Sequence, residues 1–374
     1  MKFHPKVQEA VDTIDMNRTT RRRLLSGAGL ASASLAASAL LTACSDDQPN
    51  AQGTIGNFPQ TPKWKFVFVC HVTTNPFFTP TQYGAEDACK LLGCEFQWTG
   101  SVNSVVAEMV DATNTAISSK ADGVAVAVVD KAAFRAPVDR ALDAGIPVVS
   151  YNADGAPDDP GSNRLAYIGQ GLYESGYALG QRALSQIDAG DVAGFIATPG
   201  QLNIQPRIDG AQQAFKDSGK PVNFTPVATN ADVTQGLSII DAYVQGHQNA
   251  AGLLAVDAGS TQSVGQVVAK HKLRDKGLKV AGGFDLVPET LTAVKAGDLD
   301  YTIDQQPYLQ GFLPVIALYL YRLSGGLISP TQTNTGLLFV TKDNVDPYQG
   351  TKTRYEGSDT APKLVDRSGP IAHG

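Results

Sequence analysis

The sequence predicts an α/β protein built from two doubly wound parallel sheets, and three observations lead to this fold class. Short apolar runs alternate with stretches that carry apolar residues at helical spacing. The alternation begins near residue 65, and it continues through two successive series of similar size. Short runs rich in valine and other apolar residues are typical of strands buried on both faces, and intervening helices favour parallel pairing.

The first series of expected strands consists of apolar runs such as KFVFVC, GVAVAVV and PVVSY. They lie at residues 65–70, 95–98, 123–129 and 147–151. The stretch between the second and third strands carries apolar residues at helical spacing. These are Val105, Met109, Ala112, Ala116 and Ile117. Strand, helix and strand in this order predict βαβ units.

The second series repeats the pattern over the next part of the chain. Its expected strands lie at residues 165–168, 191–197, 223–229, 252–256, 280–284 and 301–303. In open sheets of this kind, ligands bind outside the carboxyl ends of the strands. The residues directly after each strand are therefore where a functional site is expected.

The segment ahead of the first strand predicts export and lipid attachment. Residues 20–25 read TRRRLL, a twin-arginine pattern, and the run of small residues at 27–40 is too short to span a membrane. The run ends in LTAC, which is typical of a lipobox with Cys44 as the lipidated residue. We therefore expect a signal at 1–44 and a mature chain anchored on the outer face of a membrane. A cytosolic protein with a basic N-terminus is the alternative.

Composition constrains the chain beyond the signal. Residues 45–62 are polar and contain glycine and proline, which predicts a flexible tether. The 330 residues after the signal suit two domains of about 150 residues each. They carry 24 basic and 33 acidic side chains, and this acidic balance argues against a nucleic-acid partner. No long apolar run occurs after residue 44, so we expect a soluble body.

Three cysteines besides Cys44 remain in the expected mature chain. Cys70, Cys89 and Cys94 show no CxxC spacing, so neither a zinc site nor a disulfide framework is indicated. One bridge, from Cys94 to Cys89 or to Cys70, is conceivable. Because proteins exported by the twin-arginine route fold in the reducing cytosol, we expect buried free thiols instead.

Enzymatic signatures are absent from the sequence. It contains no G-x-S-x-G element, no P-loop and no H-E-x-x-H motif, and the mature chain has four histidines, His71, His247, His271 and His373. His71 could be imagined as a base, but no nucleophile or metal partner accompanies it. We therefore expect a protein that is not an enzyme and that uses neither a metal nor a cofactor.

Polar and aromatic side chains gather at the ends of the expected strands. HVTTNPFF comes after the first strand, TPGQLNIQPR after 191–197, and single aspartates after the strands at 252–256 and 280–284. Planar amide, carboxylate and guanidinium groups can pair with neighbouring hydroxyls, and aromatic faces can pack on C–H patches. These are the two kinds of surface that a sugar or polyol offers.

The same elements resemble the type I periplasmic binding proteins, and within them the ribose-like sugar receptors of ABC importers. NPFF at 75–78, GIPVVSYN at 145–152, RIDG at 207–210, GGFD at 282–285 and TIDQQPYLQG at 302–311 occur in the order that the family shows. The resemblance covers residues 63–345, nearly the whole of the mature chain.

The resemblance implies a set of ligand-binding residues. They are His71, Asn75, Phe77, Phe78, Asp130, Asn152, Arg207, Asp257, Asp285 and Gln305. It places Arg207 in the cleft, where its charge would compensate Asp257 and Asp285, which would otherwise be costly buried charges. Trp98, at the end of the second strand, could also reach the cleft or lie at a sheet edge.

Plainer interpretations exist for several of these residues. Phe77 and Phe78 could be ordinary core residues, and Asn75 could cap the helix expected to start near Pro80. Arg207 could be a surface helix residue.

Departures from the ribose-type pattern bear on the ligand. Asn152-Ala153 stands where ribose receptors carry an acid followed by an arginine, Asp257 where they often carry asparagine, and His71 where they carry a small hydroxyl residue. Ribose itself is therefore not indicated, and the pocket suits a different pentose, a hexose or a linear polyol.

The resemblance also implies how the chain divides. A three-segment hinge is expected near 167–169, 305–307 and 334–336. Residues 63–167 and 306–334 would form the N-terminal lobe, residues 168–305 and 335–350 the C-terminal lobe, and residues 351–374 a polar tail. Ligand held by both lobes would favour the closed form.

We accordingly expect an extracytoplasmic, lipid-anchored and monomeric receptor, periplasmic or at the cell surface, for a monosaccharide or polyol. It would deliver the ligand to the permease and ATPase of an ABC importer. A receptor for a sugar-like signal that feeds a sensor kinase or chemoreceptor is the alternative. A DNA-binding repressor would carry a helix-turn-helix where this chain has its export signal.

Overall fold

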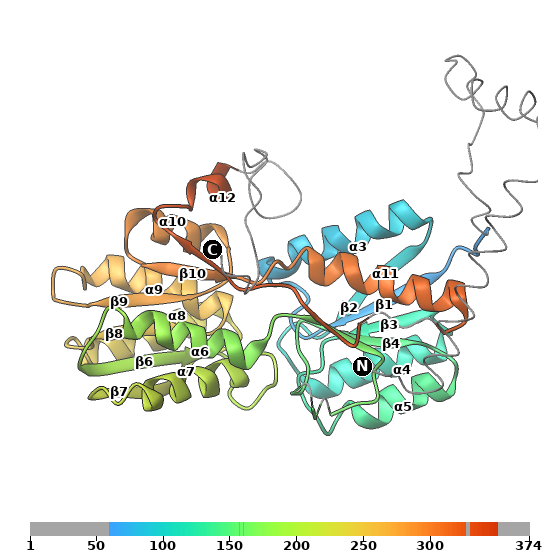
Figure 1. Ribbon diagram of the computed structural model, residues 1–374, viewed down its shortest axis with the longest axis horizontal. Coiled ribbons are helices and arrows are strands. Elements are labelled where there is room, and N and C mark those ends of the chain that lie inside the picture. The colour runs from blue at the N-terminus through green and yellow to red at the C-terminus, as the bar shows by residue number, and fades with distance from the viewer. Residues whose placement is uncertain (1–59, 157, 160, 327–329, 351–374) are drawn as a thin grey trace, which may run out of the picture. The chain divides into compact units, whose positions relative to one another are not determined.

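The computed structural model describes residues 60–156, 158–159, 161–326 and 330–350 (Figure 1). The expected signal at 1–44 and the expected tail at 351–374 lie outside these residues. Within them the chain forms two sheets of six strands each, in agreement with the predicted fold class.

The first sheet is entirely parallel, with strand order β11-β5-β4-β3-β1-β2. Its strands are β1 (Lys65–Cys70), β2 (Glu95–Gly100), β3 (Gly123–Val126), β4 (Val148–Tyr151), β5 (Ala166–Gly169) and β11 (Gln332–Asn334). The central strands β3 and β4 are buried along their whole length because helices cover both faces of the sheet.

Two pairs of helices cover this sheet, as Figure 1 shows. One face carries α3 (Thr79–Leu92) and α11 (Leu309–Ser324), and the other carries α4 (Val106–Ser118) and α5 (Arg135–Asp143). A short 3-10 helix, η2 (Pro76–Phe78), connects β1 to α3. Glycines let α3 and α11 approach closely: a Cβ on Gly84 would lie 2.1 Å from Tyr308 O, and one on Gly311 would lie 1.8 Å from Thr81 O. This sheet and its helices are called the first lobe below.

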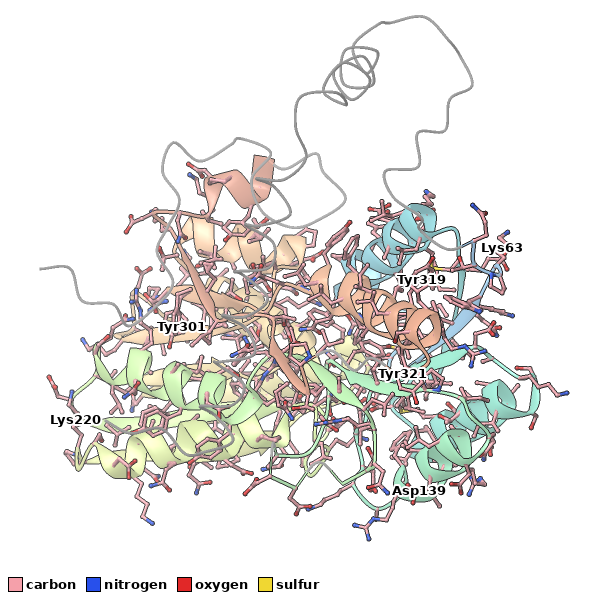
Figure 2. The ribbon with its side chains drawn as sticks, turned by 45° about the vertical axis from the view of Figure 1, so that its right-hand side comes forward. Lys63, Asp139, Lys220, Tyr301, Tyr319 and Tyr321 are labelled. Carbon is pink, nitrogen blue, oxygen red and sulfur yellow. The ribbon has the colours of Figure 1, made fainter. Side chains whose placement is uncertain are left out.

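The second sheet has the order β12-β10-β9-β8-β6-β7. Its strands are β6 (Gly190–Ile196), β7 (Val222–Ala228), β8 (Gly252–Ala255), β9 (Val280–Phe284), β10 (Tyr301–Asp304) and β12 (Leu338–Thr341). Only β12 departs from the parallel pattern, because it pairs antiparallel with β10. Tyr301 of β10, labelled in Figure 2, is fully buried between this sheet and its helices.

Helices α6 (Leu172–Leu184) and α7 (Gln205–Asp217) cover one face of the second sheet. The other face carries α8 (Val233–Gly246), α9 (Ala258–His271) and α10 (Pro288–Ala296), and α12 (Asp346–Gly350) packs on α10. This sheet and these helices are called the second lobe.

All ten expected strands are present, and their ends shift by up to three residues. The largest difference is at 123–129, where the strand ends at Val126, although the Ala127 N–H still donates to Val69 O. The two short strands β11 and β12 were not predicted. Their QTN and LFVT sequences are too short to show a periodicity.

The chain passes between the sheets three times. It crosses between β5 and α6, returns between β10 and α11, and crosses again between β11 and β12. The expected lobe boundary at residue 167 is wrong by two residues, because β5 stays in the first sheet as far as Gly169.

The expected tether is also shorter than predicted at its C-terminal end. Thr61 Oγ1 lies 3.0 Å from the hydroxyl of Tyr319, which Figure 2 shows on α11, and the Trp64 N–H donates to Pro62 O. Thr61 and Pro62 therefore belong to the folded unit, which begins at Thr61. No helix among the described residues has the length and apolarity that a bilayer crossing needs. The three described cysteines are buried and free.

Candidate functional site

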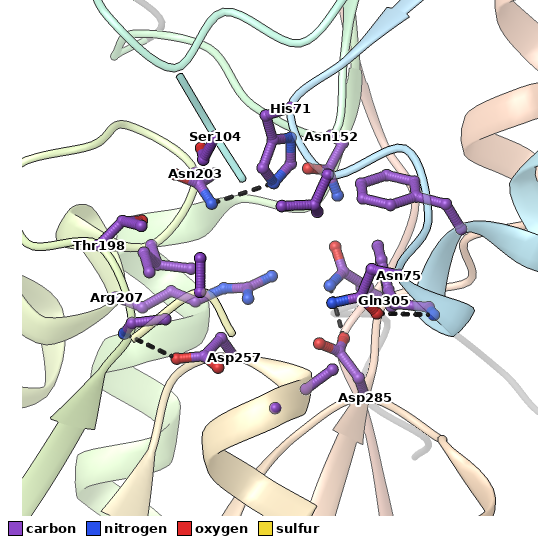
Figure 3. A pocket seen from close by; sticks show the side chains of 18 residues that line it. His71, Asn75, Ser104, Asn152, Thr198, Asn203, Arg207, Asp257, Asp285 and Gln305 are labelled. Atoms are coloured by element: carbon purple, nitrogen blue, oxygen red, sulfur yellow. Dashed lines mark hydrogen bonds between the residues drawn. The ribbon is translucent and has the colours of Figure 1, made fainter. Parts of the chain in front are cut away.

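A cavity lies where the carboxyl ends of both sheets meet (Figure 3). The first lobe contributes His71, Val72, Asn75, Phe77, Phe78, Ser104 and Asn152. The second contributes Ala197, Thr198, Asn203, Ile204, Arg207, Ala231, Asp257, Ala258, Gly259 and Asp285, and Gln305 lines the cavity from the second crossing. Its volume is about 70 Å³. An enclosed water molecule needs roughly 10–15 Å³, so the cavity has room for a ligand that replaces several water molecules.

Nine of the ten residues predicted to bind ligand lie together in the lining of this cavity. The exception is Asp130, and placing it in the site was wrong. Its Oδ1 accepts hydrogen bonds from the Ala132 and Ala133 N–H groups at 2.9 and 2.7 Å, so it shapes the turn after β3. Trp98 does not line the cavity either; its ring packs on Phe68 and Phe78, and its Nε1 donates to Thr73 O.

The segment after β1 supplies the aromatic wall. Asn75 caps η2, because its Oδ1 accepts from the Phe77 N–H at 3.0 Å, and it lines the cavity as well. Phe77 and Phe78 meet edge to face with ring centroids 4.7 Å apart, and Phe78 meets His71 in the same way at 5.3 Å. Both phenylalanines are buried in the core of the first lobe and also line the cavity, so their packing role does not exclude contact with a ligand.

Arg207, near the start of α7, is buried, with 2% of its surface exposed. Its Nη1 donates to Val256 O at 2.9 Å and its Nη2 to Gln170 Oε1 at 3.0 Å, while the guanidinium carbon lies 4.0 Å from the centre of the Phe284 ring. Burial lowers the pKa of Arg207, and the charges of nearby acids, chiefly Asp285, act in the opposite direction.

The expected compensation between Arg207 and the two aspartates takes a different form from direct pairing. Within the described part of the chain, Arg207 forms no ion pair with Asp257 or Asp285. Burial raises the pKa of both acids, and the Arg207 charge acts across the cavity against this rise. The space between them is therefore where a ligand can accept from the guanidinium and donate to the carboxylates.

Close packing of α6 on α7 holds Arg207 in place. A Cβ on Gly176 of α6 would lie 2.0 Å from Arg207 O, and one on Gly210 of α7 would lie 2.1 Å from Tyr173 O. The absence of side chains at both glycines lets the helices approach until their backbones touch. The arginine consequently projects from a rigid helix pair.

The two aspartates are positioned by their backbone surroundings. Asp257 caps α9: its Oδ1 accepts from the Ser260 N–H at 2.8 Å, and its Oδ2 accepts from the Ala197 N–H at 3.1 Å. Asp285 has a φ of +76° and accepts from Gln305 Nε2 at 2.6 Å. Burial raises the pKa of Asp285 to about 6, although the Arg207 charge and the Gln305 hydrogen bond favour ionisation.

A chain of side-chain amides connects the two lobes behind the cavity. Asn152 Nδ2 donates to Gln310 Oε1 at 3.0 Å, and Gln310 Nε2 donates to Gln305 Oε1 at 3.1 Å. Gln305 in turn donates to Asp285, so the series runs from the first lobe to the second. Gln310 is fully buried, so each amide is committed to its neighbours.

Direct hydrogen bonds also join the lobes beside the cavity. Ser104 Oγ donates to Gln201 Oε1 at 2.5 Å, Gln201 Nε2 donates to Ser104 O at 3.0 Å, and the Leu202 N–H donates to Val129 O at 2.9 Å. We refer to these three bonds as the lobe contact. The structure therefore shows the two lobes in a closed arrangement.

His71 of the first lobe and Asn203 of the second lobe meet at the cavity, with 3.2 Å between His71 Nε2 and Asn203 Nδ2. Burial lowers the pKa of His71 to about 4, so the ring is neutral at pH 7. Because the Asn203 amide donates to Nε2, the ring proton is on Nδ1.

Four polar atoms of the lining are buried and make no hydrogen bond among the described residues. They are His71 Nδ1, Thr198 Oγ1, Asn203 Oδ1 and Arg207 Nε. A buried donor or acceptor without a partner costs roughly 1–3 kcal/mol. Their concentration around one cavity marks it as the place where polar groups of the protein are left unsatisfied in the closed arrangement.

Ser104, Thr198 and Asn203 line the cavity but were not among the predicted site residues. Thr198 and Asn203 lie in the polar stretch directly after β6, so position after a strand was a usable signal for them. Ser104 lies in an irregular turn four residues beyond β2, and no pattern in the sequence distinguishes it. Among the described residues, no cluster of side chains is arranged to hold a metal ion.

A two-lobed α/β fold that encloses a polar cavity at the carboxyl ends of both sheets defines a solute-binding protein. Comparison with known proteins agrees: the model of the periplasmic binding protein domain matches residues 66–325. The chain belongs to the type I periplasmic binding protein family.

Three relatives illustrate the family. A xylose/arabinose-binding protein from Sulfolobus acidocaldarius is 49% identical over 318 residues, which cover 82% of this chain and 78% of that protein. A solute-binding protein of an ABC transporter from Burkholderia graminis, solved with D-arabinose, is 26% identical with a TM-score of 0.70 and covers 78% of this chain and 99% of its own. A carbohydrate transporter protein from Acidothermus cellulolyticus, solved with myo-inositol, is 27% identical with a TM-score of 0.68, and the match covers 77% and 97% of the two chains.

Proposed function

We propose that this protein is an extracytoplasmic receptor that encloses a monosaccharide by lobe closure and delivers it to an ABC permease. The observation that carries the proposal is the set of four unpartnered polar atoms around a cavity that both lobes line. A sugar places several hydroxyls at short spacing, and each hydroxyl both donates and accepts. Phe77 and Phe78 supply the apolar surface for its C–H patches.

We propose an aldopentose such as xylose or arabinose as the ligand. Its small volume favours a single compact ring. The relative from Sulfolobus is named for binding these two sugars, and the Burkholderia protein was solved with D-arabinose. The positions that depart from the ribose pattern, His71, Asn152 and Asp257, all line the cavity, which supports a hydroxyl pattern other than that of ribose.

Export and anchoring are part of the same proposal. The TRRRLL pattern and the LTAC lipobox support passage through the twin-arginine route and lipid attachment at Cys44, with the receptor acting as a monomer on the outer face of the membrane. The family is extracytoplasmic, which is consistent with both signals.

Arg207→Ala tests the binding site. We expect the variant to bind D-xylose or L-arabinose about tenfold to a hundredfold more weakly than the parent. The reason is that a hydrogen bond to a charged group contributes roughly 1.5–3 kcal/mol. Isothermal titration calorimetry measures the change. Arg140→Ala is the matched control, since Arg140 is exposed and donates to Asn114 far from the cavity. A variant at position 207 that bound the sugar as tightly as the parent would remove the site assignment.

Cys44→Ser tests the anchor. Lipid attachment requires the thiol, so the variant should appear in the soluble extracytoplasmic fraction while the parent stays with membranes. Fractionation followed by mass spectrometry of the N-terminus measures both. Cys89→Ser serves as the control, because Cys89 is buried in the first lobe. A lipidated N-terminus in the Cys44→Ser protein would contradict the lipobox assignment.

A further inference from the structure

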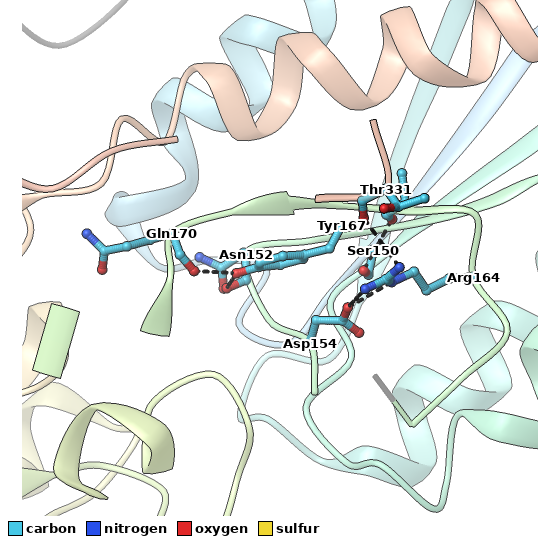
Figure 4. Close-up of polar contacts among 8 residues, drawn as sticks. Ser150, Asn152, Asp154, Arg164, Tyr167, Gln170 and Thr331 are labelled. Carbon is cyan, nitrogen blue, oxygen red and sulfur yellow. Dashed lines mark hydrogen bonds and ion pairs between the residues drawn. The ribbon is translucent and has the colours of Figure 1, made fainter. Parts of the chain in front are cut away.

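The first lobe also contains buried ionisable side chains away from the cavity. Asp154 and Arg164 form an ion pair (Figure 4), in which Arg164 Nε and Nη2 donate to Asp154 Oδ2 at 2.8 and 2.6 Å. These two charges neutralise each other and are committed to the structure. A pair of thiols has a different character. Cys89 in the last turn of α3 and Cys94 directly before β2 expose 4% and 7% of their surfaces.

The end of α3 brings these two thiols together. Gly93 has a left-handed backbone with a φ of +70°, and the Cys94 N–H donates to Cys89 O at 3.0 Å. Both features are typical of a Schellman ending, in which the side chains of the two bonded residues pack on each other. The Cys89 thiol accordingly donates a hydrogen bond to Cys94, which raises the pKa of Cys89 and lowers that of Cys94. Cys94 is therefore the thiol that ionises first.

The third described cysteine is too far away to join this pair. In the register of β1 with β2, Lys65 lies opposite Glu95, next to Cys94. Cys70 lies opposite Gly100 at the other end of the two strands, roughly 16 Å along them. A disulfide needs Cα atoms within about 7 Å of each other, so Cys89 is the partner that Cys94 can reach.

The turn above the thiols faces open space. Leu91 is 71% exposed, and a Cβ on Gly93 would meet no atom of the described residues within 4 Å. A small displacement of this turn, of the kind that helix ends undergo, opens Cys94 to a reagent in solution.

We propose that Cys89 and Cys94 are a dithiol site that closes into a disulfide under oxidising conditions such as those outside the cytosol. The oxidant is a small-molecule disulfide. The Cys94 thiolate attacks one of its sulfurs and releases one thiol, and the Cys89 thiolate then attacks Cys94 Sγ and releases the second. Two thiols of the chain are oxidised, the oxidant is reduced to two thiols, and both protons pass to the departing sulfurs.

The bridge joins the last turn of α3 to the start of β2 and acts on stability rather than on sugar binding. Cys89 lies roughly 15 Å along α3 from Thr79, the end of the helix beside the aromatic wall of the cavity. We therefore expect the oxidised and reduced proteins to bind sugar equally well. Oxidation should raise the melting temperature by about 3 °C, because the bridge restricts a short loop of the unfolded chain.

Peptide mapping of the full chain after treatment with oxidised glutathione tests the site. After alkylation in denaturant, cleavage at Glu86 and Glu95 yields the peptide DACKLLGCE, which contains both cysteines of the pair and excludes Cys70. We expect this peptide to escape alkylation and to be lighter by two hydrogen atoms. Cys70→Ser should keep the bridge, whereas Cys94→Ser should lose both the bridge and the rise in melting temperature.

Protein taken from the extracytoplasmic fraction without reductant should already carry the bridge, an expectation that rests on the proposed export. Free thiols in that fraction would overturn the proposal. So would alkylation of both cysteines after glutathione treatment, glutathione retained on Cys94, or a bridge to Cys70. Sugar affinity measured on the same samples keeps the two proposals apart, because loss of the bridge should leave it unchanged and a failure to bind sugar would leave the peptide result unchanged.

Discussion

Arg207 shows how a single residue makes this site depend on a ligand. A buried guanidinium without an ion pair is costly, and here two neutral acceptors and the Phe284 ring offset only part of that cost. Its Nε has no partner among the described residues. The arginine is therefore only partly satisfied in this arrangement, which is what the proposed contact with accepting oxygens of a ligand would complete.

Four non-glycine residues at or beside the site have a left-handed backbone. Asn152, Asp285 and Gln306 have φ values of +62°, +76° and +53°, and Ser104, in the cavity lining, is a fourth with +59°. Asparagine and aspartate tolerate this region better than other side chains, but each such residue still costs of the order of 1 kcal/mol. The first two aim their side chains at the cavity directly after β4 and β9, so the local strain positions binding groups.

At the residue scale we predict that sugar affinity falls as the pH is lowered. Burial gives Asp285 a pKa of about 6 in the closed arrangement without ligand, and a sugar hydroxyl that donates to its carboxylate favours the ionised form. Binding then lowers this pKa, so affinity is full above about pH 7 and weakens as the pH falls through 6, by up to tenfold per unit. Titration calorimetry between pH 7.5 and 5 measures this.

Two variants define that experiment. Asp285→Asn should flatten the pH dependence. Asp304→Asn should keep a pH dependence but shift it to lower pH, because Asp304 does not line the cavity and its charge raises the pKa of Asp285. An affinity in the parent that stayed constant from pH 7.5 to 5 would rule out a carboxylate acceptor at Asp285.

The sequence sufficed for side chains that come immediately after a strand or lie in a motif, as His71, Asn152 and Asp285 do. It failed for Asp130, because an aspartate after a strand also forms turns, and only the fold shows that its Oδ1 accepts from the Ala132 and Ala133 N–H groups. It could not identify Ser104, whose place at the cavity depends on a turn conformation with a φ of +59°. Long-range geometry rather than local pattern decides both cases.

At the scale of elements, the site depends on the closeness of α6 and α7. The reciprocal contacts at Gly176 and Gly210 fix the backbone from which Arg207 projects, and the same device joins α3 to α11 through Gly84 and Gly311. Helical periodicity predicted that these helices exist. Which helix faces lie in contact could not be read from it, because glycine in a helix is equally consistent with a weak helix and with a close approach.

The lobe contact yields a prediction about release of the ligand. Gln201 makes two hydrogen bonds to Ser104 across the lobes and does not line the cavity. Gln201→Ala should therefore raise the dissociation rate of the sugar roughly thirtyfold, since two hydrogen bonds contribute about 1 kcal/mol each, and should leave the association rate nearly unchanged.

Stopped-flow fluorescence measures both rates. Gln213→Ala is the matched control, because Gln213 donates to Asp217 within α7 and touches neither the cavity nor the first lobe. If Gln201→Ala released the sugar at the parent rate, the lobe contact would have no part in holding the closed form.

At the scale of the whole molecule, the three crossings and the amide chain couple the lobes. Three side chains, Gln305, Gln310 and Thr335, lie beside all three crossing segments, which run between β5 and α6, between β10 and α11, and between β11 and β12. These side chains bond to one another: Gln310 Nε2 donates to Thr335 Oγ1, and the Thr335 hydroxyl donates to Gln305 O. Three parallel connections restrict the relative motion of the lobes to a bend. The resemblance placed these crossings within a few residues, whereas composition and periodicity alone predicted only two sheets.

The last prediction is that ligand closes the receptor in solution. Four lining atoms have no partner among the described residues in the closed arrangement unless a ligand supplies one. The free protein should therefore populate a more open form. Sugar should shift the protein toward the closed form by contacts that only the closed form makes. A folded unit of this size has a radius of gyration of about 20 Å, and we expect small-angle scattering to show a decrease of the order of 1 Å at saturating D-xylose or L-arabinose. Arg207→Ala should show no decrease at the same sugar concentration, which separates closure from a general effect of the solute. An unchanged profile for the parent at saturation, with binding verified by calorimetry, would mean that the lobes are already closed without ligand and that the unpartnered atoms do not drive the motion.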